Sequence, residues 1–275
     1  MEIEWLASNL RMVEPGLWKA PSESSVSYPD EGNAWCFSIE DSSFWFAHRN
    51  RCILETIKRF PTNGLFLDVG SGNGFVSLAI HKAGREVACL EPGKIGALNA
   101  KTRGLPIVIN SSFEEAGFKS CSLGAIGLFD VMEHIQDDRG FLLKLKESLV
   151  PDGKIFLTVP AYPCLWSKED EFAGHFRRYS PTSISRLVER SGLKIDYLTH
   201  VFSILPCPVF FFRVLPFKFG LGKPIDLEIE RQRHLQPAGL FGKLLQQIWD
   251  TEAAAIKAGL RIPFGASLLV VASKG

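Results

Sequence analysis

The chain has 275 residues, enough to bury a sizeable core, and this length fits one large domain with appendages better than two domains. Apolar residues make up 46% of the chain and charged residues 22%, which excludes an intrinsically disordered protein. The formal net charge is +1, so the charge balance argues against a nucleic-acid partner, and we expect none.

The six cysteines are scattered along the chain, without close pairs or a regular framework. Such cysteines are typical of reduced thiols in a cytoplasmic protein, and they do not predict a zinc site. The first residues lack the basic start and apolar stretch of a signal peptide, and no apolar run reaches the roughly 18 residues needed to cross a bilayer. We therefore expect a cytoplasmic location.

Residues 1–40 contain three prolines, several serines and three tryptophans, and they predict an irregular N-terminal arm ahead of a domain that spans 41–275. Asp41-Ser-Ser can cap a helix that runs to about Phe60.

The stretch from Leu65 to Phe75 predicts a strand, a tight turn and a helix. Three glycines at alternate positions, Gly70, Gly72 and Gly74, let the backbone turn sharply and approach a ligand closely. The free N–H groups at the start of the helix can donate to that ligand. Because such a turn lies at the carboxyl end of a strand, it predicts a ligand site of an open α/β sheet.

Two carboxylates near this turn indicate the kind of ligand. Glu91 ends the next apolar run, and a carboxylate there can accept hydrogen bonds from both hydroxyls of a ribose. In the dinucleotide pattern G-x-G-x-x-G the third glycine would stand at the position of Phe75. Asp68 would repel a pyrophosphate and attract an ammonium or sulfonium group. The spacing therefore favours a cationic nucleotide cofactor over a dinucleotide.

The pattern Asp68-x-Gly70-x-Gly72-x-Gly74 followed by Glu91 resembles the first two motifs of the class I S-adenosyl-L-methionine (SAM)-dependent methyltransferases, and the resemblance extends from about 65 to 200. It implies SAM as the cofactor and a Rossmann-like α/β fold with helices on both faces of a mostly parallel sheet. The expected sheet has seven strands in the order 3-2-1-4-5-7-6, with the last strand antiparallel. The expected strands are 65–69, 87–90, 107–109, 123–129, 154–159, 193–199 and 266–272.

The resemblance also implies which residues contact the cofactor. The glycine loop would lie at its amino-acid moiety, Glu91 at the ribose, the segment after the third strand at the adenine, and the tip of the fourth strand at the sulfonium. The candidate cofactor residues are Asp68, Gly70, Ser71, Gly72, Gly74, Glu91, Pro92, Ser112, Phe113, Phe129 and Asp130.

The segment 130–134, Asp-Val-Met-Glu-His, leaves the fourth strand and resembles the motif that faces the acceptor in this family. His134 is the first candidate base because the unperturbed pKa of histidine lies near neutrality. Asp130, Glu133 and His134 can alternatively hold a divalent metal, as the resemblance to ubiquinone-pathway O-methyltransferases suggests. A third interpretation is that Glu133 and His134 only hydrogen-bond the loop. Among these three interpretations, we do not expect the metal site.

A long aromatic and charged loop, 160–179, follows the fifth strand at the edge where an acceptor pocket would be built. Its Gly-His-x-Arg-Arg-Tyr segment resembles one bacterial subgroup of the family, and it makes His175 the second candidate base. The same subgroup carries the aromatic and basic segment 44–50, whose helix helps to close the cofactor site. Candidate acceptor contacts are Trp45, Arg49, Tyr162, Trp166, Arg178 and Tyr179.

Each group of acceptor contacts has a structural alternative. Asp170 or Glu171 can pair with the arginines of the loop as a latch. Trp45 can pack on the sheet as part of an aromatic helix face, with Arg49 in solvent.

Residues 200–264 separate the last two expected strands, where this family usually has a short turn. Their first part, 201–219, is apolar but is interrupted by Pro206, Pro208 and Pro216 and carries two basic residues, which argues against a spanning helix. We interpret the insert as a helical cap over the acceptor pocket. The alternatives are a homodimer surface and peripheral membrane contact through 201–219.

The sequence thus predicts a SAM-dependent methyltransferase that transfers a methyl group to a small-molecule or lipid-like acceptor, at oxygen. One alternative is a non-catalytic SAM-binding or interaction protein. The other is an NAD(P)-dependent oxidoreductase, against which Asp68 and Phe75 argue.

Overall fold

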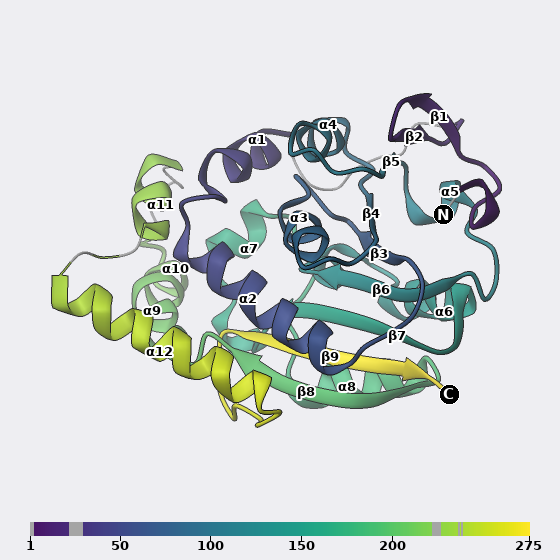
Figure 1. Cartoon of the computed structure of the whole chain (residues 1–275). Coiled ribbons are helices and arrows are strands. Elements are labelled where there is room, and N and C mark those ends of the chain that lie inside the picture. Colours follow the sequence, from purple (N-terminus) through teal and green to yellow (C-terminus); the bar gives the residue numbers. More distant parts are fainter. Residues whose placement is uncertain (1–2, 22–29, 222–226, 236, 238) are drawn as a thin grey trace.

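The computed structural model describes residues 3–21, 30–221, 227–235, 237 and 239–275. Its centre is a nine-stranded sheet in the order β1-β2-β5-β4-β3-β6-β7-β9-β8 (Figure 1). The strands are β1 (Arg11–Glu14), β2 (Leu17–Lys19), β3 (Phe66–Val69), β4 (Val87–Leu90), β5 (Val108–Asn110), β6 (Leu123–Phe129), β7 (Leu149–Pro160), β8 (Leu193–Val201) and β9 (Ser267–Lys274).

Helices cover both faces of this sheet. They are α1 (Asp30–Ile39), α2 (Phe44–Arg59), α3 (Phe75–Lys82), α4 (Lys94–Thr102), α5 (Phe113–Ala116), α6 (Asp138–Ser148), α7 (Lys168–Phe172), α8 (Pro181–Arg190), α9 (Pro206–Val209), α10 (Leu215–Lys218), α11 (Leu227–His234) and α12 (Gly239–Lys257). Short 3-10 turns lie at Ile3–Trp5, Met132–His134 and Pro163–Leu165, and a π-helical stretch at Phe210–Val214 joins α9 to α10.

The seven strands from β5 to β8 confirm the predicted order and the predicted antiparallel last strand. β3 pairs in parallel with both β4 and β6, whereas β9 runs antiparallel between β7 and β8. The chain first moves outward from β3 to β5 and then returns to β6 on the other side of β3. The carboxyl ends of β3 and β6 therefore flank the point where the strand order reverses, which is where open α/β sheets bind ligands.

The prediction of an irregular N-terminal arm is wrong for two segments. β1 and β2 form an antiparallel hairpin, and β2 adds to the sheet edge in parallel with β5, with Leu17 opposite Val108. Gly16 makes the turn with φ +76°, and a Cβ atom there would lie 2.5 Å from the carbonyl oxygen of Pro106. α1 then follows and packs against α4. The arm thus becomes two strands and a helix of the same domain.

Each central strand contributes to two hydrophobic cores, one on either face of the sheet. In β3 and the residue before it, Leu65, Leu67 and Val69 face the core shared with α5, α6 and α8. Phe66 faces the other core, which is shared with α2, α3, α4 and α12. Because these parallel strands are buried on both faces, they consist of nearly continuous apolar residues.

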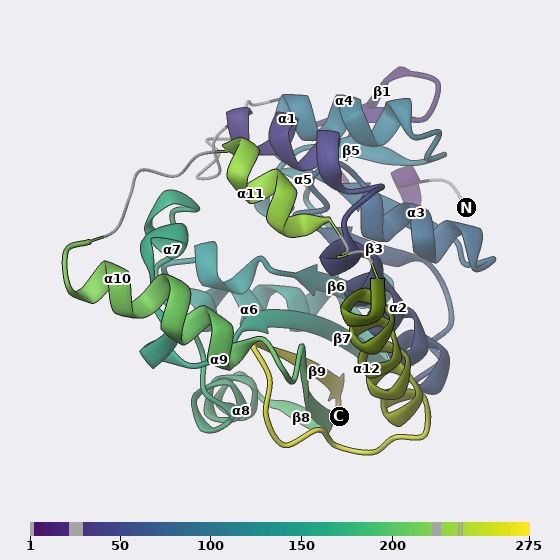
Figure 2. The ribbon, with the colours of Figure 1, turned by 90° about the vertical axis from the view of Figure 1, so that its left-hand side faces the viewer.

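The helices between β8 and β9 gather at one end of the molecule. Figure 1 shows α9, α10, α11 and the start of α12 at this end, and Figure 2 shows α10 beside α7 on the left and α12 beside α2 on the right. The predicted interruption of this segment by proline is wrong. Pro206 and Pro208 lie in the first turn of α9, where an N–H has no intrahelical partner, and the π-helical stretch precedes Pro216. Among the described residues, no helix is long and apolar enough to cross a membrane.

One buried carboxylate joins these helices to the rest of the domain. Glu252 of α12 lies 2.5 Å from Nε2 of His48 in α2, and both side chains are 2% exposed. The same carboxylate accepts the backbone N–H groups of Phe202 at 3.0 Å and Ser203 at 2.9 Å, just after β8. Phe202 adopts φ +64°, a conformation that needs such support in a non-glycine residue. Glu252 therefore positions α12, α2 and the end of β8 together.

We expect Glu252→Ala to lower the free energy of unfolding by about 3 to 5 kcal/mol, because it leaves buried partners of the carboxylate unsatisfied. Urea unfolding followed by circular dichroism measures this change. Asp250→Ala on the same helix is the matched control, because its partner Arg51 is half-exposed and such pairs contribute less than about 1 kcal/mol. Equal losses in the two variants would contradict the prediction.

Candidate active site

A cavity of about 1020 Å³ lies at the carboxyl ends of β3, β4 and β6. Ligand pockets commonly measure about 300 to 1,000 Å³, so this cavity has room for a nucleoside cofactor and an acceptor together. All predicted cofactor residues except Gly74 line it. Gly74 lies behind the wall, where a Cβ atom would come within 2.6 Å of the Leu105 side chain.

The glycine loop owes its course to backbone conformations that favour glycine. Gly70, Gly72 and Gly74 have φ values of +67°, +53° and +73°. A Cβ atom at Gly70 would approach the Val131 side chain to 2.8 Å, so the loop runs closely against the segment that follows β6. The loop therefore brings the strand ends of β3 and β6 to the same part of the cavity.

Glu91 lies at the end of β4 and anchors the other side of the loop. Its two carboxylate oxygens accept the N–H groups of Gly72 and Gly93, each at 2.7 Å. Burial raises the pKa of this carboxyl to about 7, although the two backbone hydrogen bonds favour ionisation. Each carboxylate oxygen can still accept a further donor, as the two hydroxyls of a ribose would require.

Asp68 is buried at the end of β3 and accepts a hydrogen bond of 2.5 Å from Ser77 Oγ at the start of α3. Burial raises the pKa of the Asp68 carboxyl to about 7 as well, against the hydrogen bond from Ser77. The glycine loop, Glu91 and Asp68 thus form a polar cradle in which a cationic nucleoside fits.

Asp130 lies at the tip of β6 in a left-handed conformation, φ +59°. Non-glycine residues in this region are uncommon and cluster at functional sites. Arg49 of α2 forms an ion pair with Asp130, and Thr158 Oγ1 donates to it at 3.0 Å. The Arg49 guanidinium also lies over the Trp45 ring, 5.0 Å from its centroid. Arg49 therefore lines the cavity with Trp45, and its predicted alternative in solvent is wrong.

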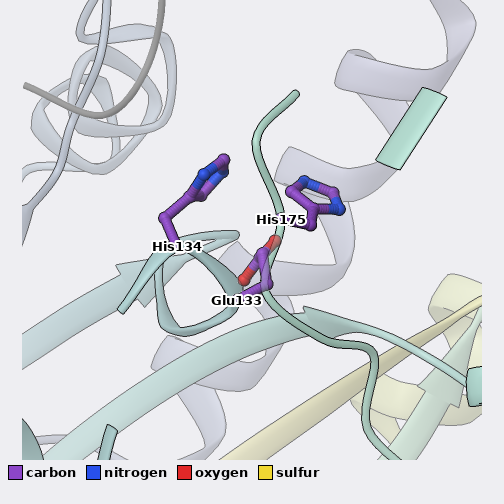
Figure 3. Close-up of side chains that lie close together, drawn as sticks. All are labelled: Glu133, His134 and His175. Atoms are coloured by element: carbon purple, nitrogen blue, oxygen red, sulfur yellow. The ribbon is translucent and has the colours of Figure 1, made fainter. Parts of the chain in front are cut away.

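Glu133, His134 and His175 converge beside this tip (Figure 3). One donor atom from each lies within 4.8 Å of the others, so the group can offer one carboxylate and two imidazoles to a metal ion. Burial, and next the charge of His175, lower the pKa of His134 to about 4. Burial, and next the charge of Asp130, raise the pKa of Glu133 well above its usual range. Near neutral pH His134 is therefore uncharged, and burial favours the protonated form of Glu133.

His175 is held by a buried carboxylate. Its Nδ1 lies 2.8 Å from Oδ1 of Asp170, which also accepts the Nε–H of Arg178 at 2.8 Å. Although burial opposes ionisation, the hydrogen bond from His175 and the charge of Arg178 lower the pKa of Asp170. With Nδ1 engaged, Nε2 is the ring nitrogen of His175 that can serve the cavity. The predicted latch between Asp170 and an arginine thus exists, and it orients a histidine.

Three predicted acceptor contacts do not line the cavity: Tyr162, Trp166 and Tyr179. The Tyr179 hydroxyl donates to Met132 O at 3.1 Å and to Asp138 at 2.9 Å, behind the wall. Tyr162 stacks on His200 and hydrogen-bonds to its Nε2 at 2.9 Å. Trp166 is half-buried at the end of a 3-10 turn. The wall does include Trp45, Arg49, Arg178 and both candidate bases.

The cavity wall also contains residues that the sequence did not predict, notably Asn33, Asn73 and His234. Asn73 in the glycine loop donates to the backbone oxygen of Asn33 at 2.9 Å, so α1 supports the loop. His234 at the end of α11 stacks on Phe46 and lies 2.9 Å from Ser43 Oγ. A helical spacing of apolar residues within 34–39 is the signal that would have identified α1.

Comparison with protein families shows which family the chain belongs to. A family model described as "Methyltransferase domain" matches residues 44–198, from the start of α2 into β8. The chain belongs to this methyltransferase family. It shares the Rossmann-like fold of the class I SAM-dependent methyltransferases. The comparison with curated proteins gave no match.

Solved structures support the fold of this methyltransferase. The complex between the Haloferax volcanii Trm112 methyltransferase activator and a methyltransferase gives a TM-score of 0.58 at 16% identity, over 89% of this chain and 95% of that chain. A SAM-dependent methyltransferase of Thermotoga maritima gives 0.54 at 15% identity, over 90% and 95%. Phosphoethanolamine N-methyltransferase 2 of Haemonchus contortus, solved with SAM, gives 0.55 at 17% identity, over 90% and 58%.

We expect His134 to remain neutral down to about pH 4 because of its burial, and this can be followed by NMR titration of the imidazole signals. In His175→Asn the pKa of His134 rises, because the electrostatic effect of His175 on His134 is removed. It stays below the ordinary value of 6.5, since burial, the larger cause, is unchanged. His134→Asn identifies the signal among the six histidines. A His134 signal that titrates near pH 6.5 in the unmodified protein would contradict this geometry.

Proposed function

We propose that this methyltransferase transfers a methyl group from SAM to a hydroxyl oxygen of a small-molecule or lipid-like acceptor. The observation that carries the proposal is the pair formed by His175 and Asp170 at the cavity that also contains the glycine loop and Glu91. A hydroxyl is a weak nucleophile until its proton is removed, and a histidine held by a carboxylate is suited to accept that proton.

The cofactor residues divide the cavity into two parts. The glycine loop and Asp68 would hold the amino-acid moiety of SAM, and Glu91 would accept both ribose hydroxyls. Ser112 and Phe113 would flank the adenine, while Phe129 and Asp130 would lie near the sulfonium. The remaining space, next to His134 and His175, is left for the acceptor.

SAM supplies an electrophilic methyl group that needs no further activation. The chain would then align the acceptor oxygen with the methyl group, exclude water, and accept the hydroxyl proton. As the new carbon–oxygen bond forms, Nε2 of His175 accepts that proton, and Asp170 stabilises the resulting imidazolium. The old carbon–sulfur bond breaks with its electron pair on sulfur, which leaves S-adenosylhomocysteine and a methyl ether. Neutral His134 can accept a hydrogen bond from the acceptor but is a weaker base.

The family membership removes the support for an oxidoreductase, whereas a non-catalytic SAM-binding protein would share every cofactor residue. Cofactor binding and methyl transfer therefore need separate experiments.

The first experiment is titration with S-adenosylhomocysteine by calorimetry, with NADH as the control ligand. Ribose hydroxyls donate to ionised Glu91, whose pKa is about 7 in the free protein, so binding should release protons and tighten as the pH rises from 6 to 8. We expect Glu91→Gln to weaken binding by about tenfold to a hundredfold and to reduce the pH dependence. The pH dependence that remains in Glu91→Gln would come from Asp68, whose pKa is also about 7. Binding of NADH but not of S-adenosylhomocysteine would overturn the cofactor assignment.

The second experiment measures transfer of a radiolabelled methyl group from SAM to lipid-linked and phenolic acceptors. We expect His175→Asn to lower kcat by about 100-fold to 10,000-fold, the usual contribution of a general base, with little change in affinity for S-adenosylhomocysteine. His134→Asn should have the smaller effect, and His81→Asn, exposed on α3, is the control. Turnover that survives in His175→Asn would remove this residue from the mechanism.

A further inference from the structure

A group of large apolar side chains is exposed at one end of the molecule. We call this surface the cap end and define it as 204–221, which includes α9 and α10, together with 239–244 at the start of α12. Figure 1 places these segments at the same end, and Figure 2, which looks onto that end, shows α9 and α10 on the left and α12 on the right. Its exposed large apolar residues are Ile204, Phe211, Phe212, Phe219, Leu221, Leu240, Phe241 and Leu244.

Several of these side chains are largely exposed to solvent. Phe212 and Phe219 are 76% and 73% exposed, and Leu240 at the start of α12 is 86% exposed. The opposite face of α12 is buried, with Leu245 and Trp249 in the core next to α2. Helices that are apolar on the buried face and also on the outer face need a second apolar environment.

The charge of the cap end indicates which environment that is. Between 201 and 221 the charged residues are Arg213 and Lys218, and between 239 and 249 the one charged residue is Lys243. Lys218 and Lys243 are exposed, so apolar and cationic side chains share this surface. An anionic phospholipid surface complements both, whereas a second copy of the chain would bring like charges together. Neighbouring α11 has mixed charge, with Glu228 near Arg231, and is not included in the surface.

The apolar surface is continuous with the cavity. Leu205, Pro208, Val209 and Phe212 of the cap end line the cavity wall, and Phe212 is 76% exposed. Arg213 and Glu169 of α7 also line the cavity, and they form an ion pair at 3.3 Å. A molecule with an apolar tail could keep that tail against the cap end while its polar head group reaches the histidines.

We propose that the cap end docks on an anionic phospholipid membrane and that the acceptor is a membrane-resident lipid with a hydroxyl-bearing head group. The exposed apolar side chains on either side of α10 and at the start of α12 enter the interface between head groups and acyl chains, and Lys218 and Lys243 contact lipid phosphates. The choice of acceptor rests on the proposed function, whereas the docking does not.

The test is sedimentation of the full chain with phosphatidylglycerol-containing vesicles and with pure phosphatidylcholine vesicles. We expect stronger binding to the anionic vesicles, and Phe211→Ser with Phe219→Ser should lower the partition coefficient at least about tenfold on both. Replacing Lys218 and Lys243 by Gln should lower it about fivefold per lysine on anionic vesicles only. The matched control is Met12→Ser with Val13→Ser, which removes two exposed apolar side chains from β1.

Calorimetry with S-adenosylhomocysteine shows whether each variant is folded and separates the two proposals. A wild-type protein that binds this ligand but neither kind of vesicle would overturn the membrane proposal and leave the proposed function intact. A protein that binds vesicles but not S-adenosylhomocysteine would overturn the proposed function and leave the membrane proposal intact. Equal loss of binding in the control variant, or a dimer in light scattering that the Phe211 and Phe219 changes dissociate, would also overturn the membrane proposal.

Discussion

The site depends on four carboxyl groups, three of them buried, at the ends of three neighbouring strands. Asp68 lies near the end of β3, Glu91 follows β4, and Asp130 and Glu133 follow β6. Three of the four have different local partners: a serine hydroxyl for Asp68, two backbone N–H groups for Glu91 and an arginine from α2 for Asp130. Burial raises the pKa of Asp68 and of Glu91 to about 7, so both respond to any cation or hydroxyl that enters the cavity.

This arrangement explains why α2 and α1 belong to the site although they precede the first central strand. Arg49 reaches from α2 to Asp130 over the ring of Trp45, and Asn33 of α1 accepts a hydrogen bond from the glycine loop. The loop at 160–179 contributes from the other side, through Asp170 and His175. The neighbouring helices α1 and α2 and the distant loop 160–179 therefore surround one set of strand ends. Their positions depend on buried polar contacts as much as on apolar packing.

Two half-buried histidines show how environment separates similar groups. His134 is surrounded by protein and by another histidine, which together lower its pKa to about 4. His175 lies 4.8 Å away, ring to ring, but its Nδ1 meets the carboxylate of Asp170. The ordinary pKa of histidine makes His134 the first candidate base and His175 the second. In our proposal the hydrogen bond that His175 donates to Asp170 reverses that order, because the carboxylate can stabilise the charge that a base acquires.

The sequence by itself determined the strands of the central sheet and the glycine turn, because these depend on short-range signals, and the family resemblance implied the strand order. Apolar runs of strand length, glycines with φ above zero and carboxylates at strand ends can each be recognised from a few adjacent residues. Ten of the eleven candidate cofactor residues line the cavity, and Gly74 lies behind its wall.

Only the tertiary structure decided the rest, because it depends on contacts between distant segments. The pairing of β2 with β5, the ion pair of Arg49 with Asp130 and the attachment of Glu252 to His48 each join residues more than 80 positions apart. Tyrosines are common in pocket walls, but Tyr162 hydrogen-bonds to His200 and Tyr179 to Asp138, and neither lines the cavity. No local pattern records such choices, since they are made by which side chains meet after the chain has folded.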